Sequence, residues 1–166
     1  MVVQIGAKPD SGFDDPIGML RDCHRKIENF LGVLYLVAEC AKDRSLTGEE
    51  RNAVETALHY FREESMFPRL RAFGTDSLEE IDRLEDDHRE AGYLHESVED
   101  LYSKWIGSGG LRPEDALQLS SKTERLKQLY ATHIQVEETI VFTHAARVLD
   151  GHTMKTIGSE FQMRRQ

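Results

Sequence analysis

The sequence predicts an all-α protein, an up-down-up-down four-helix bundle with a short fifth helix at its C-terminal end. Apolar residues recur at spacings of three and four along four long segments, and no alternating strand pattern competes with them. Helix-start signals and glycines separate the segments. The loops between them are only a few residues long, which favours antiparallel neighbours.

The first and second predicted helices cover residues 16–41 and 48–73. Before the second helix, Thr47 stands at the N-cap and Glu50 follows three residues later, which together form a capping box. Pro68 should kink this helix or end its regular part, because proline lacks an N–H and crowds the preceding turn. The inward stripe of the first helix consists of Ile17, Leu20, Ile27, Leu31, Leu34 and Ala38.

The third and fourth predicted helices cover residues 77–106 and 113–150. The third opens with a second capping box, "SLEE". The fourth opens with Pro113 and two acidic residues that suit the positive end of a helix dipole. Glycines in "GSGG" and at Gly151 mark helix ends. A short fifth helix is predicted near residues 153–164.

The length and charge of the chain limit its class of function. Its 166 residues suit one domain, which we expect to consist of an N-terminal arm over residues 1–14 and the bundle over residues 15–166. The net charge of −9 argues against nucleic acid and anionic membrane as partners, because both attract a basic surface. No signal peptide or disulfide framework is evident, so a cytoplasmic location is expected.

The longest apolar run is "FLGVLYLVA" at residues 30–38, about half the length that a membrane span needs. It is apolar around nearly the whole helix, whereas a bundle core requires only one stripe. We therefore expect the outer side of the first helix to contribute to a homodimer contact.

Four of the 7 histidines fall on the inward stripes, one on each long predicted helix. Those of the second and fourth helices are followed at i+4 by a glutamate, which shares their face of the helix. Buried groups of this kind need a partner that offsets the loss of water, either a metal ion or a hydrogen-bond network. The inward set consists of His24, His59, Glu63, His88, His133 and Glu137.

The arrangement of this set favours metal. A single His-x-x-x-Glu pair would be weak support, because the pattern occurs twice elsewhere in this glutamate-rich chain as an ordinary ion pair or core histidine. Here the same half-site occurs twice in the same order, on helix pairs that an up-down bundle relates by a pseudo-two-fold axis. His95 lies seven residues past His88, about 10 Å farther along the helix, and is expected to be a core histidine outside the site.

Two imidazoles and one carboxylate per half-site suit two metal ions that share the carboxylates and an oxygen as bridges. Each ion then keeps an open position. Nitrogen and carboxylate ligands with open positions favour iron over structural zinc, which prefers closed tetrahedral sites, and manganese stays an alternative.

These motifs resemble those of hemerythrin-like (HHE cation-binding) proteins. The resemblance runs from "DPIGMLRDCHRKI" through "HYFREESMFPRLR", "LEDDHREAGYLH" and "HIQVEETIVF" to "IGSEFQMRR", which is nearly the whole chain. The order His, His-x-x-x-Glu, His, His-x-x-x-Glu is the ligand set of di-iron members of that family. The resemblance therefore implies two non-haem iron ions with a bridging oxygen, held by His24, His59, Glu63, His88, His133 and Glu137.

Two departures from the family pattern bear on function. Oxygen-carrying hemerythrins have a second histidine one turn after that of the third helix, where this chain has Gly92. The second-helix motif is one residue shorter than usual before "FP", so Glu64 is an alternative ligand to Glu63. Both departures argue against oxygen storage. Bacterial iron–sulfur-repair proteins and the iron-sensing F-box domain resemble this version of the site, which has six protein ligands.

The resemblance implies a protein that binds O2 or NO, or senses iron or redox state, at a carboxylate-bridged di-iron centre. One alternative is a di-iron enzyme or iron–sulfur cluster repair factor with NO or peroxide chemistry. Another is a metal-free helical interaction module. Since no general-acid residue is clearly placed at the open position, binding is favoured over catalysis.

Overall fold

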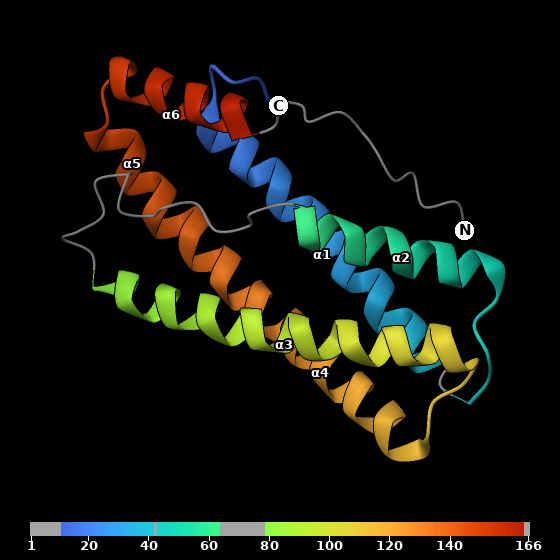
Figure 1. Ribbon diagram of the computed structural model, residues 1–166. Coiled ribbons are helices and arrows are strands. Elements are labelled where there is room, and N and C mark those ends of the chain that lie inside the picture. The colour runs from blue at the N-terminus through green and yellow to red at the C-terminus, as the bar shows by residue number, and fades with distance from the viewer. Residues whose placement is uncertain (1–10, 42, 64–78, 165–166) are drawn as a thin grey trace.

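The computed structural model describes residues 11–41, 43–63 and 79–164, and within these ranges it contains helices and no strand (Figure 1). Its elements are α1 (Pro16–Ala41), α2 (Gly48–Glu63), α3 (Glu80–Ser108), α4 (Pro113–Val136), the π-helical turn η2 (Glu137–Val141), α5 (Phe142–Val148) and α6 (Gly151–Arg164). The prediction of an all-α fold is therefore confirmed. In the described part of the chain, no helix has both the length and the apolar character to cross a membrane.

The long helices α1 to α4 form the bundle. Figure 1 shows the chain reversing direction from each of these helices to the next. α1 packs against α2 and α4, and α3 packs against the same two helices, so each helix has two neighbours. α6 returns along the bundle and packs on α1 as the short C-terminal helix that the sequence predicts (Figure 1).

Most predicted helix limits agree with the structure. α1 has its predicted range. The capping box before α2 is formed, because the Thr47 N–H donates to Glu50 Oε2 at 2.9 Å and the Glu50 N–H donates to Thr47 Oγ1 at 3.2 Å. The last part of the second predicted helix with Pro68, and Ser77 of the second capping box, lie in residues 64–78, outside the described residues.

The C-terminal part of the bundle differs from the prediction. The fourth predicted helix, residues 113–150, is interrupted by the π-helical turn η2 and ends at Val148. Gly151, predicted to mark a helix end, begins α6 instead. The cause is Asp150, whose Oδ1 accepts a hydrogen bond from the Thr153 N–H at 2.7 Å and so caps the new helix.

The core consists of two apolar clusters along the bundle. The larger lies among α1 to α4 and includes Leu34 and Trp105. The smaller lies where the start of α1 meets α3, α5 and α6, and it includes Ile17 and Phe142. All six residues of the predicted α1 stripe are buried. The stripe residues before His24 belong to the smaller cluster, and the stripe residues after His24 belong to the larger one.

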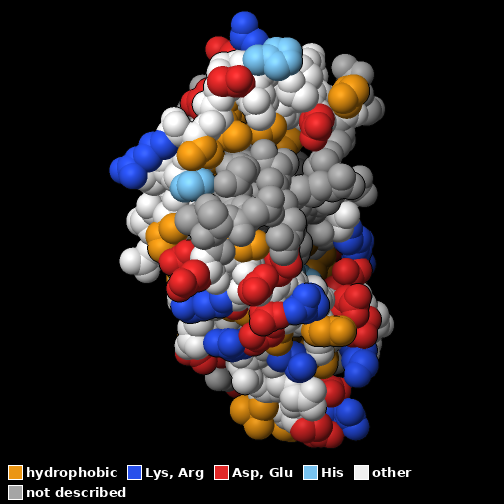
Figure 2. Space-filling model, turned by 90° about the vertical axis from the view of Figure 1, so that its left-hand side faces the viewer, with side chains coloured by type: hydrophobic (Ala, Val, Ile, Leu, Met, Phe, Trp, Pro, Cys, Tyr) orange, Lys and Arg blue, Asp and Glu red, His pale blue; other side chains and the backbone are white. Residues whose placement is uncertain are grey.

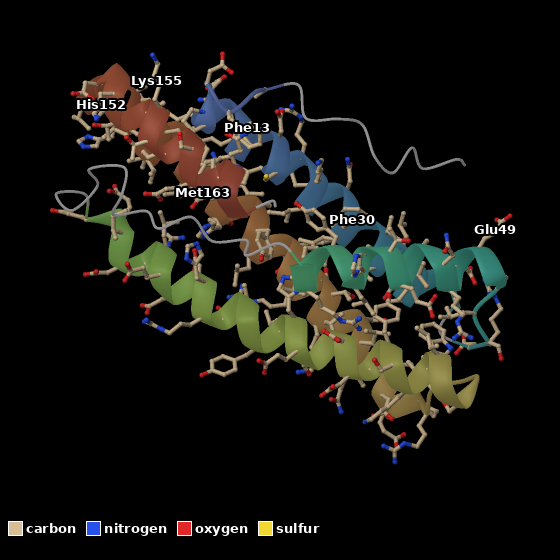
Figure 3. The ribbon with its side chains drawn as sticks, turned by 45° about the horizontal axis from the view of Figure 1, so that its top comes forward. Phe13, Phe30, Glu49, His152, Lys155 and Met163 are labelled. Carbon is tan, nitrogen blue, oxygen red and sulfur yellow. The ribbon has the colours of Figure 1, made fainter. Side chains whose placement is uncertain are left out.

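Two glycines permit close backbone contacts. Gly109 follows α3 with a φ of 75°, and its N–H donates to the Trp105 carbonyl at 2.9 Å, which confirms the predicted helix end there. Gly158 of α6 lies against the main chain of Phe13, since a Cβ at this glycine would stand 1.8 Å from the Phe13 carbonyl oxygen. Figure 3 shows Phe13 between α6 and the start of α1.

The surface is mixed in charge. Figure 2 shows acidic and basic side chains interspersed over the lower part of one face, where the described residues form no continuous basic area. On the outer side of α1, Leu36 is 57% exposed, so an apolar side chain is available there. The homodimer contact stays a prediction.

Candidate metal centre

Four of the six predicted site residues converge in the bundle. They are His24 from α1, His88 from α3, His133 from α4 and Glu137 from η2. His24, His133 and Glu137 are buried, and His88 is half-buried. Each falls on the apolar stripe of its helix, so the packing that buries the stripe also brings the polar group inside.

The carboxylate of Glu137 lies at the centre of this group. Its Oε2 is 2.9 Å from His24 Nε2, and its Oε1 is 3.3 Å from His133 Nε2 and 4.0 Å from His88 Nε2. Glu137 is only 2% exposed. One buried carboxylate therefore has an imidazole from α1 on one oxygen and imidazoles from α3 and α4 on the other.

The imidazoles of His88 and His133 face each other. Their Nε2 atoms are 2.9 Å apart and their ring centroids 4.5 Å apart. Without a further partner, one Nε2 must carry a proton and donate it to the other. With a cation between the rings and Glu137, both nitrogens would offer lone pairs instead.

The donor set fits a cation. The buried Glu137 Oε1 makes no hydrogen bond with the described residues, and His133 Nε2 at 3.3 Å is an ion-pair contact only. A buried carboxylate oxygen without a hydrogen bond costs free energy. Ligand atoms of His88, His133 and Glu137 all lie within 4.8 Å of one another. A cation among them would satisfy an oxygen that the protein leaves without a hydrogen bond.

Two further carboxylates orient the histidines. His133 Nδ1 lies 3.3 Å from Asp87 Oδ2, and His24 Nδ1 lies 2.9 Å from Glu138 Oε1. A proton held on Nδ1 by a carboxylate leaves the lone pair on Nε2, which is the nitrogen that points into the site. Neither residue belongs to the ligand set that the sequence predicts. The available signal was their position, since Asp87 precedes His88 and Glu138 follows Glu137.

The pKa values suit a ligand set. Burial alone would raise the pKa of Glu137, but the imidazoles of His133 and His24 outweigh it and lower the pKa, so the carboxylate is ionised. Burial would lower the pKa of His24, yet Glu137 and Glu138 raise it. Burial, and then the charge of His133, lowers the pKa of His88 to about 4. His88 is therefore neutral at pH 7 and can offer a lone pair.

The π-helical turn η2 begins at Glu137, directly after the helix that carries His133. A π turn places one extra residue in a helical turn, and such turns are frequent at functional sites. Phe142, the first residue after it, stacks on the His24 ring with centroids 5.5 Å apart and planes 9° apart. The irregular turn thus supplies the carboxylate and is followed by the aromatic wall of the site.

The structure does not bring His59 into this group. The sequence predicted an inward side chain, but His59 is exposed on α2, while Ala57 and Leu58 are buried. Successive residues of an α-helix are about 100° apart, so His59 lies one step past the inward face. The side chain of Glu63 and the whole of Glu64 lie outside the described residues. The ligand roles of His59 and Glu63 stay predictions.

His95 is a core histidine outside the site, as the spacing predicts. Its Nε2 is 3.1 Å from the Tyr130 hydroxyl oxygen, and its ring packs on Phe61 with centroids 4.5 Å apart. Burial lowers its pKa to about 4. His95 therefore has a hydrogen-bond partner of its own and does not belong to the metal-ligand group.

Comparisons with known proteins agree with this arrangement. The model of the hemerythrin HHE cation binding domain matches residues 15–145. The chain is also 28% identical over 165 residues to an uncharacterized protein of Haemophilus influenzae, and the match covers 93% of this chain and 92% of that protein. No solved structure matches the chain significantly. Because the family model spans most of the chain and includes the whole His/Glu group, the chain belongs to the hemerythrin HHE cation-binding domain family.

Proposed function

We propose that the His/Glu group is one part of a carboxylate-bridged, non-haem di-iron centre. Its ligands are His24, His59, Glu63, His88, His133 and Glu137, with an oxygen bridge between the ions. At this centre the protein binds O2 or NO, or senses iron or redox state.

The observation that carries the proposal is the position of Glu137. Its two oxygens face imidazoles from opposite sides, and Oε1 is buried without a hydrogen-bond partner in the described chain. A carboxylate that offers one oxygen to each of two cations needs this geometry. A hydrogen-bond network alone would be expected to satisfy both oxygens.

Iron is the metal that the donors support best. The group offers imidazole nitrogens and a carboxylate and no thiolate, which suits iron or manganese with open positions better than a closed structural zinc site. The alternative function, a di-iron enzyme or iron–sulfur cluster repair factor with NO or peroxide chemistry, would use the same ligands. Binding is favoured because the sequence places no general-acid residue clearly at the open position.

The proposal predicts the metal content. Protein purified after expression in iron-supplemented medium should hold about two iron ions per chain. Elemental analysis measures the content, and the absorption spectrum of the reduced protein with and without NO measures ligand binding. One zinc ion per chain, or no metal after iron supplementation, would contradict the di-iron centre.

The carboxylate behind His133 gives a second prediction. Asp87→Asn should weaken iron binding about 10- to 100-fold, because Asn cannot hold the Nδ1 proton of His133 with a negative charge. Competition with a chelator measures the affinity. The control is Asp86→Asn, which removes the same charge from an exposed residue that pairs with Arg89. Equal weakening in both variants would mean that only net charge matters.

A further inference from the structure

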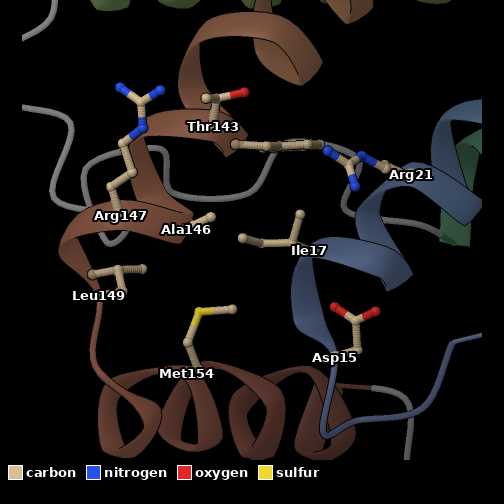
Figure 4. A pocket seen from close by; sticks show the side chains of 9 residues that line it. Asp15, Ile17, Arg21, Thr143, Ala146, Arg147, Leu149 and Met154 are labelled. Carbon is tan, nitrogen blue, oxygen red and sulfur yellow. The ribbon is translucent and has the colours of Figure 1, made fainter.

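A pocket of about 530 Å³ lies beside the metal centre, between the start of α1, α5 and α6. Figure 4 shows Arg21, Thr143 and Arg147 along one side and Leu149 and Met154 along the other. This volume falls within the range of about 300–1,000 Å³ that is usual for small-molecule sites. The pocket thus combines a cationic side with an apolar side.

The cationic side is available for an anion. Among the arginines whose side chains are described, Arg21, Arg83 and Arg147 make no ion pair within the described chain, whereas the others pair with carboxylates. The one acidic residue of the pocket, Asp15, is engaged in the first turn of α1, where its Oδ1 accepts the Gly18 N–H at 2.9 Å. With two arginines and one aspartate in its lining, the pocket has a net charge of +1 in a chain whose net charge is −9.

We propose that this pocket binds a small amphipathic carboxylate, an apolar chain or ring that carries one carboxyl group, and that Phe142 relays its binding to His24. Guanidinium groups form two parallel hydrogen bonds with a carboxylate, which neither lysine nor a neutral side chain reproduces. The apolar body of the ligand would cover Ile17 and Met154 and remove their surface from water.

Phe142 connects the pocket to the metal centre. Its ring lines the pocket, the Cζ of Arg21 lies 5.9 Å from the ring centroid, and the ring also stacks on His24. His24 contacts Glu137. An anion that moves Arg21 changes the surroundings of Phe142, and through the stacked rings it changes those of His24. This path exists in the protein chain itself and does not require bound metal.

The test uses the metal-free full chain and decanoate as the probe. Isothermal titration calorimetry should give one binding site. Arg21→Gln combined with Arg147→Gln should weaken the affinity at least about tenfold, because two charge-assisted hydrogen bonds are lost. Arg51→Gln combined with Arg125→Gln removes the same charge from exposed residues outside the pocket and should leave the affinity unchanged. Equal weakening by both pairs would overturn the proposal.

Two further arms complete the test. Ala146→Phe fills the pocket, keeps both arginines and should abolish decanoate binding. In NMR spectra of the imidazole groups, decanoate should shift the signals of His24 and leave those of His95 in place.

Vesicles with phosphatidylglycerol should not sediment the protein. Sedimentation with vesicles, without binding of free decanoate, would assign the arginines to a membrane surface and overturn the proposal. Because the protein is metal-free throughout, failure here is distinct from failure of the di-iron proposal.

Discussion

His133→Ala is expected to remove the bound metal and to lower the free energy of unfolding of the metal-free protein by about 2–4 kcal/mol. The His133 side chain is buried, with Nε2 at 2.9 Å from His88 and 3.3 Å from Glu137. Its loss takes away a ligand, leaves the Glu137 carboxylate with His24 as its close imidazole partner, and opens a cavity. Elemental analysis measures the metal, and urea unfolding measures the stability.

His95→Ala is the matched control. It removes the same side chain from the same bundle core and breaks one hydrogen bond, to Tyr130. The free energy of unfolding should fall by about 1–3 kcal/mol, while the metal content stays the same. Loss of iron in His95→Ala together with retention in His133→Ala would contradict the assignment of the site.

His59→Ala decides the role of the histidine that the structure leaves outside the group. The family resemblance predicts loss of metal in this variant too. Because His59 is exposed, the metal-free protein should lose less than about 0.5 kcal/mol of stability. Retention of both iron ions would remove His59 from the proposed ligand set and would leave His24, Glu63, His88, His133 and Glu137 as its remaining members.

The sequence was sufficient for the bundle and for the inward position of four of the six predicted site residues. Helical periodicity is repeated over many turns, so a few misleading residues do not change the helices or their inward faces. His24, His88 and His133 lie between strongly apolar neighbours on their stripes, and those neighbours fixed their direction. His59 comes directly after two apolar residues, Ala57 and Leu58. These two residues form the inward face of α2 at this point, and His59 lies outside it.

Contacts between helices were beyond the sequence analysis. Asp87 and Glu138 orient histidines on other helices, and a reading of one helix at a time shows only that they adjoin ligand positions. The π-helical turn at Glu137–Val141 also gave no compositional signal, because it changes the hydrogen-bond pattern and not the type of residue. The two carboxylate contacts depend on how α4 and η2 pack against α3 and α1.

Gly92 gives the last prediction, which concerns the reaction with oxygen. It lies on α3 one turn after His88, where oxygen-carrying hemerythrins have a histidine. A Cβ at Gly92 would meet no atom within 4 Å, so the chain has room for a side chain there. In the proposed di-iron centre, two histidines per iron and this open space would leave both ions accessible to solvent. We therefore expect the reduced protein to oxidise quickly in air, without reversal on removal of oxygen.

Gly92→His should change this behaviour. In the proposed centre the variant would add a third imidazole at one iron, make the ligation uneven and leave one ion saturated, and its side chain would fill the open space. Its oxidation in air should be slower by about tenfold, and part of the absorbance change should reverse on deoxygenation. Tyr93→His is the control, because this neighbouring residue is 74% exposed and adds a histidine away from the site. Stopped-flow absorbance after mixing the reduced proteins with oxygen measures both. A reversible absorbance change in the unaltered protein would show that Gly92 does not prevent oxygen carriage. Oxygen storage would then be the favoured function.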